Sequence, residues 1–411
     1  MKKGAFESRL LVLVTLGLVA FGLVMVYSAT SAPAALARTD PMSYLKKQTA
    51  YALIGVVLLV VAARFDYRRL RPLAPTLVLS ALFLCLVVLA VGERVNGARR
   101  WITIGPASFQ PSELAKLALA VWAAAYLSRR PAPRTLKELA RPTGVLVGAF
   151  SLLVLAEPDL GTAIAIVVIL AAVLLVSGTP TRTLSFGTGL VATLGLIAIW
   201  LEPYRRARVF SFLNPWQDAQ GAGFQTVQAL IALGSGGWLG AGLGQGVTKV
   251  NYLPEAHTDM IMAVIGEELG LLGVIAVIAA FAVFAYAGLR VALDCRDPFG
   301  KRLAAGLVAL VCGQALINLA AVLGLAPLTG IPLPFISYGG SSLVVALLSV
   351  GILLNIAGSH ASERRAEVRD RSRRDGRTRA AVPRGGGSAR QTRRARDVRR
   401  VAGPRRGSAR S

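Results

Sequence analysis

The sequence predicts an all-α polytopic membrane protein, and two features of its composition carry this prediction. Of the 411 residues, 54% are apolar and only 16% are charged, a balance that an ordinary soluble domain does not have. The apolar residues are also gathered into runs of about 17 to 25, the length that a helix needs to cross a bilayer. We therefore expect about ten transmembrane helices.

The ten expected spans lie between about Leu10 and Gly358, and polar or turn-forming residues separate them. The fourth and fifth runs are the shortest and carry polar residues. In chain order the runs are centred near Ala20, Val57, Phe83, Val121, Phe150, Val168, Val191, Ile275, Leu310 and Leu348.

Basic residues predict the orientation, because short loops rich in Lys and Arg stay in the cytoplasm. Residues 1–9 are basic and are expected inside, and ten spans return the carboxyl terminus to the same side. The basic segments 64–71, 128–141 and 293–302 also fall inside by this count. Segments 92–101 and 202–210 are basic yet fall outside, which indicates either an anionic partner there or ordinary solvated loop charge.

The chain changes character at its end, where residues 359–411 form an Arg-rich tail. This tail holds 18 Arg, no Lys and five acidic residues, with almost no large apolar side chain. It cannot bury a core, so we expect a disordered cytoplasmic tail that lies near anionic lipid of the inner leaflet. No nucleic-acid partner is expected.

A large extracytoplasmic loop, residues 202–258, is expected between the seventh and eighth spans. Seven of the thirteen positions from Gly234 to Gly246 are glycine, which lets backbone approach another backbone or a ligand closely. The spacing fits neither the dinucleotide fingerprint nor the phosphate loop of NTPases. The sequence therefore argues against a bound nucleotide.

Acidic residues at the eighth apolar run are the strongest functional signal. Asp259 stands at its start, and Glu267 and Glu268 follow about two helical turns later. An ionisable side chain is unfavourable at membrane depth, so such residues indicate a functional site that faces a cavity or the outer surface.

Without a nucleotide, synthesis at the outer face needs a substrate that is already activated, and lipid-linked pyrophosphates are such donors. Glycosyl transfer from them needs a base for the attacking hydroxyl and cations for the departing pyrophosphate. Asp259 is the candidate base, or the ligand of a divalent cation such as Mg²⁺ or Mn²⁺, with His257 as a weaker second ligand. The candidate phosphate ligands are Arg99, Arg100, Arg205, Arg206, Arg208 and Lys249.

Two further polar groups lie in or beside the spans. Glu113 and Lys116 are three residues apart and share one face of the fourth helix, where they are either a buried pair that fixes helix register or part of a catalytic site. Ser337, followed by Tyr338 and Gly339, precedes the last span and is expected to line a cavity. Residues 157–162 are expected to form a tight outer turn.

Five segments together carry a resemblance to a known family. They are QPSELAKL (110–117), EPDLGTA (157–163), the stretch from Tyr204 to Gln225, LPEAHTDMIMAVIGEELG (253–270) and GIPLPFISYGGSS (330–342). Their amino-acid sequences and their order along the chain resemble those of the SEDS family of shape, elongation, division and sporulation proteins, over about Leu10 to Gly358. The division members are more similar than the elongation members.

The resemblance implies a peptidoglycan glycosyltransferase that polymerises lipid II at the outer face of the bacterial cytoplasmic membrane, at the division septum, and releases undecaprenyl pyrophosphate. It implies a class B penicillin-binding protein and other division proteins as partners. It also marks Asp259 as the essential residue and adds roles for Glu113, Lys116 and Asp159. Met260 stands where the family usually has Phe, an apolar change beside the Asp.

Three other functions remain open from the sequence. A lipid II flippase would also need polar residues inside a helical bundle. An elongation-type polymerase would share the chemistry but not the septal location. A non-catalytic scaffold would depend on the tail more than on Asp259.

Overall fold

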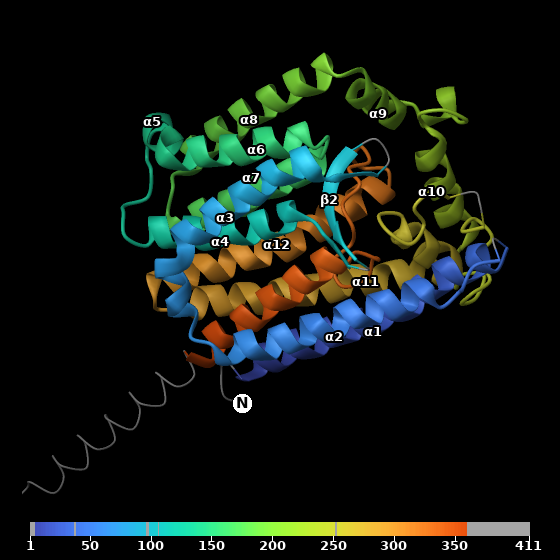
Figure 1. The fold of residues 1–411 in the computed structure, drawn as a ribbon, viewed down its shortest axis with the longest axis horizontal. Helices are drawn as coiled ribbons and strands as arrows, with labels where there is room; N and C mark the ends of the chain where they lie inside the picture. Colours follow the sequence, from blue (N-terminus) through green and yellow to red (C-terminus); the bar gives the residue numbers. More distant parts are fainter. Residues whose placement is uncertain (1–4, 37, 96–97, 106, 251–252, 360–411) are drawn as a thin grey trace, which may run out of the picture. The chain divides into compact units, whose positions relative to one another are not determined.

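The computed structural model describes residues 5–36, 38–95, 98–105, 107–250 and 253–359 (Figure 1). The predicted Arg-rich tail lies outside the described residues from position 360 onward. The membrane-embedded part is built from α1 (Ala5–Leu36), α2 (Ser43–Arg64), α3 (Leu70–Val91), α4 (Pro111–Leu127), α6 (Val145–Ala156), α7 (Leu160–Ser177), α8 (Thr181–Leu201), α11 (Ile261–Asp294), α12 (Pro298–Val322) and a last helix, Gly340–Ser359. Shorter elements connect them: η1 (Tyr67–Arg69), β1 (Glu93–Val95), β2 (Ala98–Ile104), β3 (Ala107–Phe109), α5 (Leu136–Leu139), η2 (Ala140–Gly144), α9 (Pro203–Leu213), η3 (Pro215–Asp218) and α10 (Phe224–Ser235).

The predicted helical membrane protein is confirmed, and each of the ten expected centres lies in a helix. Within the described residues, nine helices have at least 18 residues and enough apolar content to cross a bilayer. The fifth expected span is one of these nine, because α5, η2 and α6 run together from Leu136 to Ala156. The fourth expected span is α4, which has only 17 residues and begins with Pro111 at its first turn.

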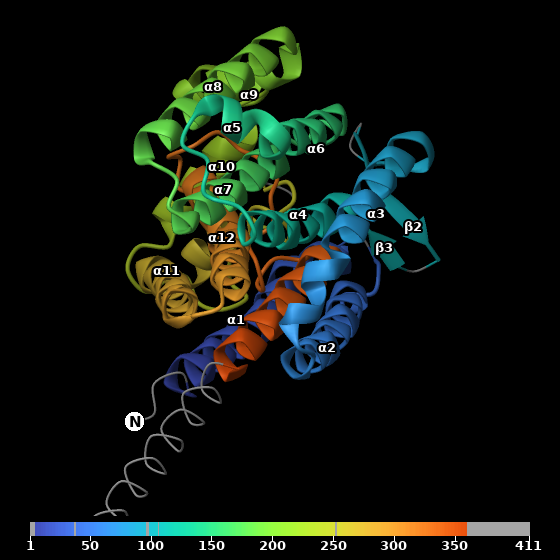
Figure 2. The same cartoon turned by 90° about the vertical axis from the view of Figure 1, so that its left-hand side faces the viewer.

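The centre of the bundle is formed by α12, the last helix and α4. In the most apolar stretch of α12 and of the last helix, 72% and 78% of the residues are buried, whereas α8 buries none of its stretch. Figure 2 shows α8 at the periphery, away from α1 and α2. Small residues allow the central helices to approach closely: a Cβ at Gly306 of α12 would lie 3.3 Å from the Cβ of Ala120 of α4.

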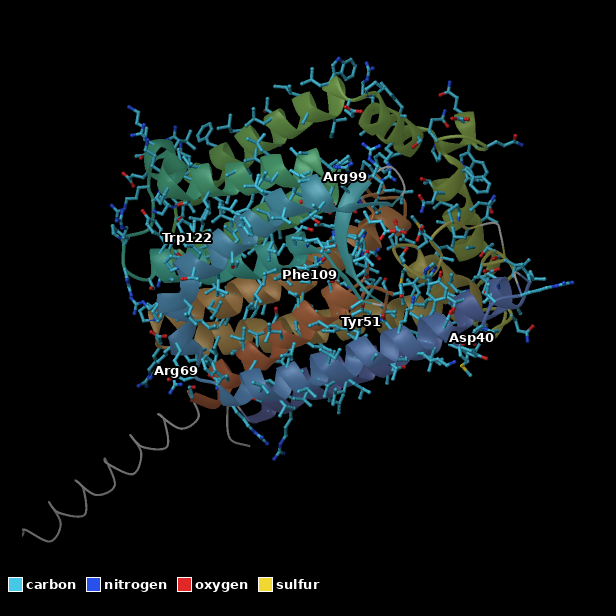
Figure 3. All side chains as sticks on the ribbon, in the orientation of Figure 1. Asp40, Tyr51, Arg69, Arg99, Phe109 and Trp122 are labelled. Atoms are coloured by element: carbon cyan, nitrogen blue, oxygen red, sulfur yellow. The ribbon has the colours of Figure 1, made fainter. Side chains whose placement is uncertain are left out.

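The basic connecting segments lie at one end of the bundle, as the charge pattern predicts. The α2–α3 and α11–α12 connections and α5 lie at the left in Figure 1, together with the start of α1 and the end of the last helix. Arg69 in the first of these connections and Arg99 in β2 lie at opposite ends of the bundle (Figure 3). We call these the basic end and the loop end.

The sequence did not predict a small antiparallel sheet at the loop end, nor the helices α9 and α10 inside the expected loop 202–258. The order of the sheet is β1-β2-β3; the two outer strands have only three residues, and β2 (ARRWITI) shows no regular alternation of apolar and polar residues. The hydroxyl of Tyr51 in α2 accepts a hydrogen bond from Ser108 N at 3.0 Å. The sheet is thereby joined to α2, and its third strand leads directly into α4.

The helix α11 is broken at Gly270, which has a φ of 66° that favours glycine. The half from Ile261 to Leu269 carries Glu267 and Glu268, and the long half follows. A break exposes backbone groups that must find other partners at membrane depth.

The Gly-rich segment 234–246 supplies these partners. Ala241 N and Gly242 N donate to the carbonyls of Glu267 (2.9 Å) and Glu268 (3.0 Å), and Leu271 N donates to Gly237 O at 2.9 Å. A Cβ at Gly236 would lie 1.9 Å from Gly266 O, so only glycine fits there. The predicted close approach is therefore between two backbones of this chain, and it fixes the start of α11.

Candidate functional site

Asp259 lies in a compact turn immediately before α11, and two other parts of the fold hold its backbone. Asn318 Nδ2 of α12 donates to the carbonyl oxygens of Asp259 and of Ile331, both at 2.8 Å. Tyr338 N donates to the carbonyl of His257 at 2.8 Å. The turn is thus attached to α12 and to the segment 325–339, which precedes the last helix.

The carboxylate of Asp259 is half-buried and lies beside a second carboxylate. The hydroxyl of Thr258 is 3.3 Å from Asp259 Oδ1 and 3.1 Å from Glu255 Oε2, and so bridges the two acids. Burial, followed by the charge of Glu255, raises the pKa of Asp259 to about 6, while hydrogen bonds and Arg208 oppose this shift. Such a carboxylate is ionised at neutral pH and is a stronger proton acceptor than an ordinary Asp.

The space facing this carboxylate is bounded by glycine and arginine. A Cβ at Gly330 would lie 4.0 Å from Asp259 Oδ2, so the glycine leaves that face uncovered. Arg208 of α9 donates to Leu328 O at 3.1 Å, two residues before Gly330. The structure therefore brings Asp259 and Arg208 to the same segment, as the sequence predicted for a base and a phosphate ligand. The side chain of Arg205 lies outside the described part of the chain.

His257 is packed between aromatic rings. Its ring centroid is 4.7 Å from that of Tyr44 and 5.5 Å from that of Tyr338, and burial lowers its pKa. His257 is therefore neutral near pH 7, and its contacts fit a role in holding the turn.

Glu113 and Lys116 form a buried ion pair in α4 at 2.8 Å, with side-chain exposures of 3% and 0%. Lys116 Nζ also donates to the amide oxygen of Gln314 of α12 in the hydrogen-bonded orientation of that amide. Gln314 and Asn318 are four residues apart on one face of α12, about 6 Å along the axis. The pair therefore reaches the Asp259 turn through α12 and does not touch Asp259, which favours the structural interpretation over the catalytic one.

Asp159 caps the amino terminus of α7. It accepts hydrogen bonds from Thr162 N at 2.9 Å and from the Thr162 hydroxyl at 2.8 Å, and Gln110 Nε2 lies 3.4 Å away. Gly161 of this turn lies against Ile331 and Thr329. The turn at residues 157–162, expected from the sequence, thus packs on the segment that also faces Asp259.

Glu157 was not singled out from the sequence, yet its surroundings are unusual. It is fully buried, and neither carboxylate oxygen has a hydrogen-bond partner among the described residues. Burial, and then the charge of Asp159, raises the pKa of Glu157 to about 8. Arg100 Nε donates to the Glu157 carbonyl at 2.8 Å, so part of this predicted phosphate ligand is used to hold the turn.

The prediction that Lys249 binds phosphate does not fit the structure. Lys249 is 3% exposed, and its ammonium donates to Glu268 Oε1 (2.6 Å), Gly244 O (2.9 Å) and Ser28 Oγ (3.1 Å). All three donors are therefore used inside the protein. Glu268 also accepts from Ser28 Oγ at 2.7 Å and from Gly244 N at 3.0 Å.

Glu267 is likewise used to hold the loop that precedes α11. It accepts hydrogen bonds from Val247 N at 2.8 Å and Thr248 N at 3.1 Å, and from the Thr248 hydroxyl. The two acids inside the apolar run are thus bonded to the loop that precedes it. This assigns Glu267 and Glu268 to the framework of the site.

The hydroxyl of Ser337 accepts a hydrogen bond from Leu333 N at 2.8 Å, and its carbonyl accepts from Gln48 Nε2 at 3.0 Å. Ser337 is 3% exposed, and through these two bonds it closes the turn before the last helix. Asn318, Gln314 and Gln48 were missed from the sequence. The available signal was the same as for Asp259, a polar side chain inside an apolar helix.

No group of three or more His, Cys, Asp and Glu suited to a metal ion occurs in the part of the chain that the structure describes. The donor set at Asp259 is a pair of carboxylates, Asp259 and Glu255, joined through Thr258. Mg²⁺ is commonly held by one or two carboxylates together with substrate phosphates. The pair therefore fits a cation that a pyrophosphate substrate helps to bind, and does not fit a closed protein site.

Comparison with known proteins shows the family of this chain. Residues 8–362 match the family model of cell cycle proteins that covers FtsW, RodA and SpoVE. The chain is 42% identical over 346 residues to a probable peptidoglycan glycosyltransferase FtsW of a Geobacter species (strain M18), covering 83% of this chain and 94% of that protein. It is 40% identical over 353 residues to the stage V sporulation protein E of Bacillus subtilis, covering 85% and 96% of the two chains.

Solved structures agree as well. A chain from a peptidoglycan synthase complex that coordinates polymerization and crosslinking superposes with a TM-score of 0.72 at 32% identity, covering 85% of this chain and 97% of that one. The rod shape determining protein RodA of Thermus thermophilus superposes with a TM-score of 0.62 at 29% identity, covering 85% and 96%.

Proposed function

This chain belongs to the FtsW, RodA and SpoVE family of cell cycle proteins, and we propose how it acts as a peptidoglycan glycosyltransferase. It polymerises lipid II into glycan strands at the outer face of the membrane, and Asp259 is the general base. Relatives that carry the name peptidoglycan glycosyltransferase FtsW support the activity. The role of each residue is our proposal from the geometry.

The observation that carries the proposal is the environment of Asp259. Its carboxylate is half-buried and its pKa is raised to about 6; Asn318 of α12 donates to its carbonyl, and Tyr338 donates to the carbonyl of His257 two residues earlier. A general base works best when its pKa is close to the pH at which it operates. Asp259 combines this property with a position at the loop end, where lipid-linked substrate would enter.

In the proposed step, the 4-hydroxyl of an incoming lipid II attacks the anomeric carbon of the lipid-linked growing strand. The hydroxyl proton passes to Asp259, the new glycosidic C–O bond forms, and the bond from the anomeric carbon to the pyrophosphate oxygen breaks. Undecaprenyl pyrophosphate leaves with the electron pair. No step requires a nucleotide, because the lipid-linked donor is already activated.

Arginines at the loop end are the proposed ligands of the pyrophosphates. Arg208 of α9 bonds to the segment 325–339, to which the Asp259 turn is also attached, and its charge lowers the pKa of Asp259, so the two are electrostatically coupled. Arg205 and Arg206 precede it in α9, and Arg99 and Arg100 stand in β2. Guanidinium groups suit this task because their forked donors match phosphate oxygens.

As the alternative to a free carboxylate base, Asp259 and Glu255 would together hold a divalent cation, Mg²⁺ or Mn²⁺. Bound there with pyrophosphate, it would neutralise the charge of the leaving group. The residues of this chain would orient the cation and keep Asp259 ionised.

The protein is a multi-pass membrane protein. We propose that its basic end, with both termini, faces the cytoplasm and that it works at the division septum. A class B penicillin-binding protein is the proposed partner, together with other division proteins, because a similar chain belongs to a complex that coordinates polymerization and crosslinking.

A lipid II flippase is the second candidate, and the buried Glu113–Lys116 pair is the observation that favours it. Reconstitution of the protein into proteoliposomes with labelled lipid II separates the two functions. We expect glycan strands to form, and lipid II to cross the membrane no faster than in protein-free vesicles. Rapid translocation without polymer, with or without the penicillin-binding protein, would reject the proposed polymerase.

A further inference from the structure

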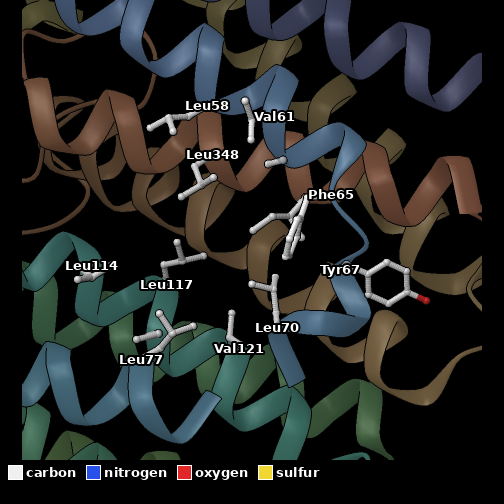
Figure 4. A pocket seen from close by; sticks show the side chains of 13 residues that line it. Leu58, Val61, Phe65, Tyr67, Leu70, Leu77, Leu114, Leu117, Val121 and Leu348 are labelled. Carbon is white, nitrogen blue, oxygen red and sulfur yellow. The ribbon is translucent and has the colours of Figure 1, made fainter. Parts of the chain in front are cut away.

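An apolar cavity of about 240 Å³ lies at the basic end, between α2, α3, α4 and the last helix (Figure 4). Its floor is made by Leu117, Ala118 and Val121 of α4, which are 6%, 1% and 1% exposed. At its mouth stand Val61 and Phe65 of the α2 end, which are 56% and 40% exposed. The cavity is therefore a groove that opens on the surface facing lipid.

Arginines flank the mouth of this groove. The segment 64–71 contains Arg64, Arg68, Arg69 and Arg71 but only one acid, Asp66, so its net charge is +3. The lining residues Phe65, Tyr67 and Leu70 alternate with these arginines along the chain. The Nε of Arg71 is buried and has no hydrogen-bond partner within the described residues.

The frame of the groove is held in place by hydrogen bonds. Tyr67 N donates to Asn355 Oδ1 of the last helix at 3.0 Å, and the Tyr67 hydroxyl donates to Asp297 Oδ2 at 3.0 Å. Asn355 Nδ2 donates to Ala63 O at 2.9 Å. These bonds fix the α2–α3 connection against two other helices, so the groove exists before any occupant binds.

We propose that this groove binds one acyl chain of an anionic phospholipid, whose phosphate is held by the arginines of segment 64–71. The apolar walls match an acyl chain, and the adjacent cations match a phosphate at the membrane surface. A zwitterionic phospholipid offers the same chain without net charge. The site lies at the opposite end of the bundle from Asp259, so it is separate from the polymerising site.

Lipid competition tests this site. The full-length protein is incorporated into nanodiscs of phosphatidylglycerol and phosphatidylcholine in equal amounts, extracted, and its retained lipid is measured by native mass spectrometry. We expect one phosphatidylglycerol to be retained in preference to phosphatidylcholine. The variants Arg64→Gln and Arg69→Gln should each reduce this preference about fivefold, because one basic residue near an anionic lipid surface contributes about 1 kcal/mol.

The apolar part is tested by Val61→Trp, which puts a large ring at the exposed mouth without overpacking the core. It should abolish retention, whereas Phe83→Trp on the exposed face of α3 should not. Arg182→Gln, a charge change at the start of α8, is the control for the arginines. Equal retention of both phospholipids, or unchanged retention in Val61→Trp, would each overturn the proposal.

Discussion

Replacing Asp259 by Asn should abolish glycan polymerisation and at the same time make the fold more stable. The pKa of Asp259 rises from 3.8 to about 6, chiefly because burial removes water from the charged form. Each pKa unit corresponds to about 1.4 kcal/mol, so the ionised carboxylate costs up to about 3 kcal/mol of folding free energy. An amide of the same shape carries no such charge.

The stabilising effect of Asp259→Asn should depend on pH in a definite direction. Because the folded pKa is above the unfolded one, the destabilisation is complete above about pH 6 and disappears as the pH falls toward 3.8. The stabilising effect of Asp259→Asn should therefore be largest at pH 8 and roughly half as large at pH 5.

Thermal unfolding in detergent measures this effect, with a thiol-reactive dye reporting exposure of the buried Cys85 and Cys295. Asp40→Asn is the matched control, because Asp40 is exposed and its pKa is lowered by Lys46. That variant should not be stabilised. A loss of stability in Asp259→Asn, or a gain that is equal at pH 5 and pH 8, would refute a desolvated carboxylate at this position.

Three further predictions follow from the same contacts. Glu255→Gln removes a charge that raises the pKa of Asp259, so the acid limb of the pH profile of kcat/KM should move below pH 6; an unmoved limb would contradict the coupling. Lys249→Met leaves Glu268 buried without its ion-pair partner and should lower the free energy of unfolding by about 3–5 kcal/mol. The double variant Lys249→Met with Glu268→Gln should recover much of this loss. A double variant that is no more stable than the single variant would argue against the ion pair. Gly236→Ala places a methyl group against the backbone of α11 and should lower both melting temperature and activity, whereas Gly234→Ala, which meets open space, should change neither.

Much of the fold could be predicted because membrane helices are apolar along their whole length. All ten expected centres lie in helices, and the basic connections share one end. The sheet at residues 93–109 was missed because its outer strands have only three residues and β2 (ARRWITI) lacks a regular alternation of apolar and polar residues. The break at Gly270 was missed for a different reason: its lost hydrogen bonds are replaced by a segment about thirty residues earlier, and spacing alone does not show that pairing.

The candidate site was predictable in its residues and less so in their roles. An acid beside an apolar run pointed to Asp259, and the structure attaches both the Asp259 turn and Arg208 to the segment 325–339. The same signal pointed to Glu267 and Glu268, which instead bind the outer loop. Lys249 looked like a phosphate ligand because its loop is outside the spans. Its partner Glu268 is 19 residues away, and only folding brings the two together.

The central claim is that Asp259 is the base of a lipid II polymerase. It is tested most directly by glycan formation from purified lipid II, using the detergent-solubilised protein with its class B penicillin-binding protein, and comparing wild type with Asp259→Ala. We expect long glycan strands from the wild type and none from the variant, which should still fold and bind its partner. Strands of normal length and rate from Asp259→Ala would contradict it.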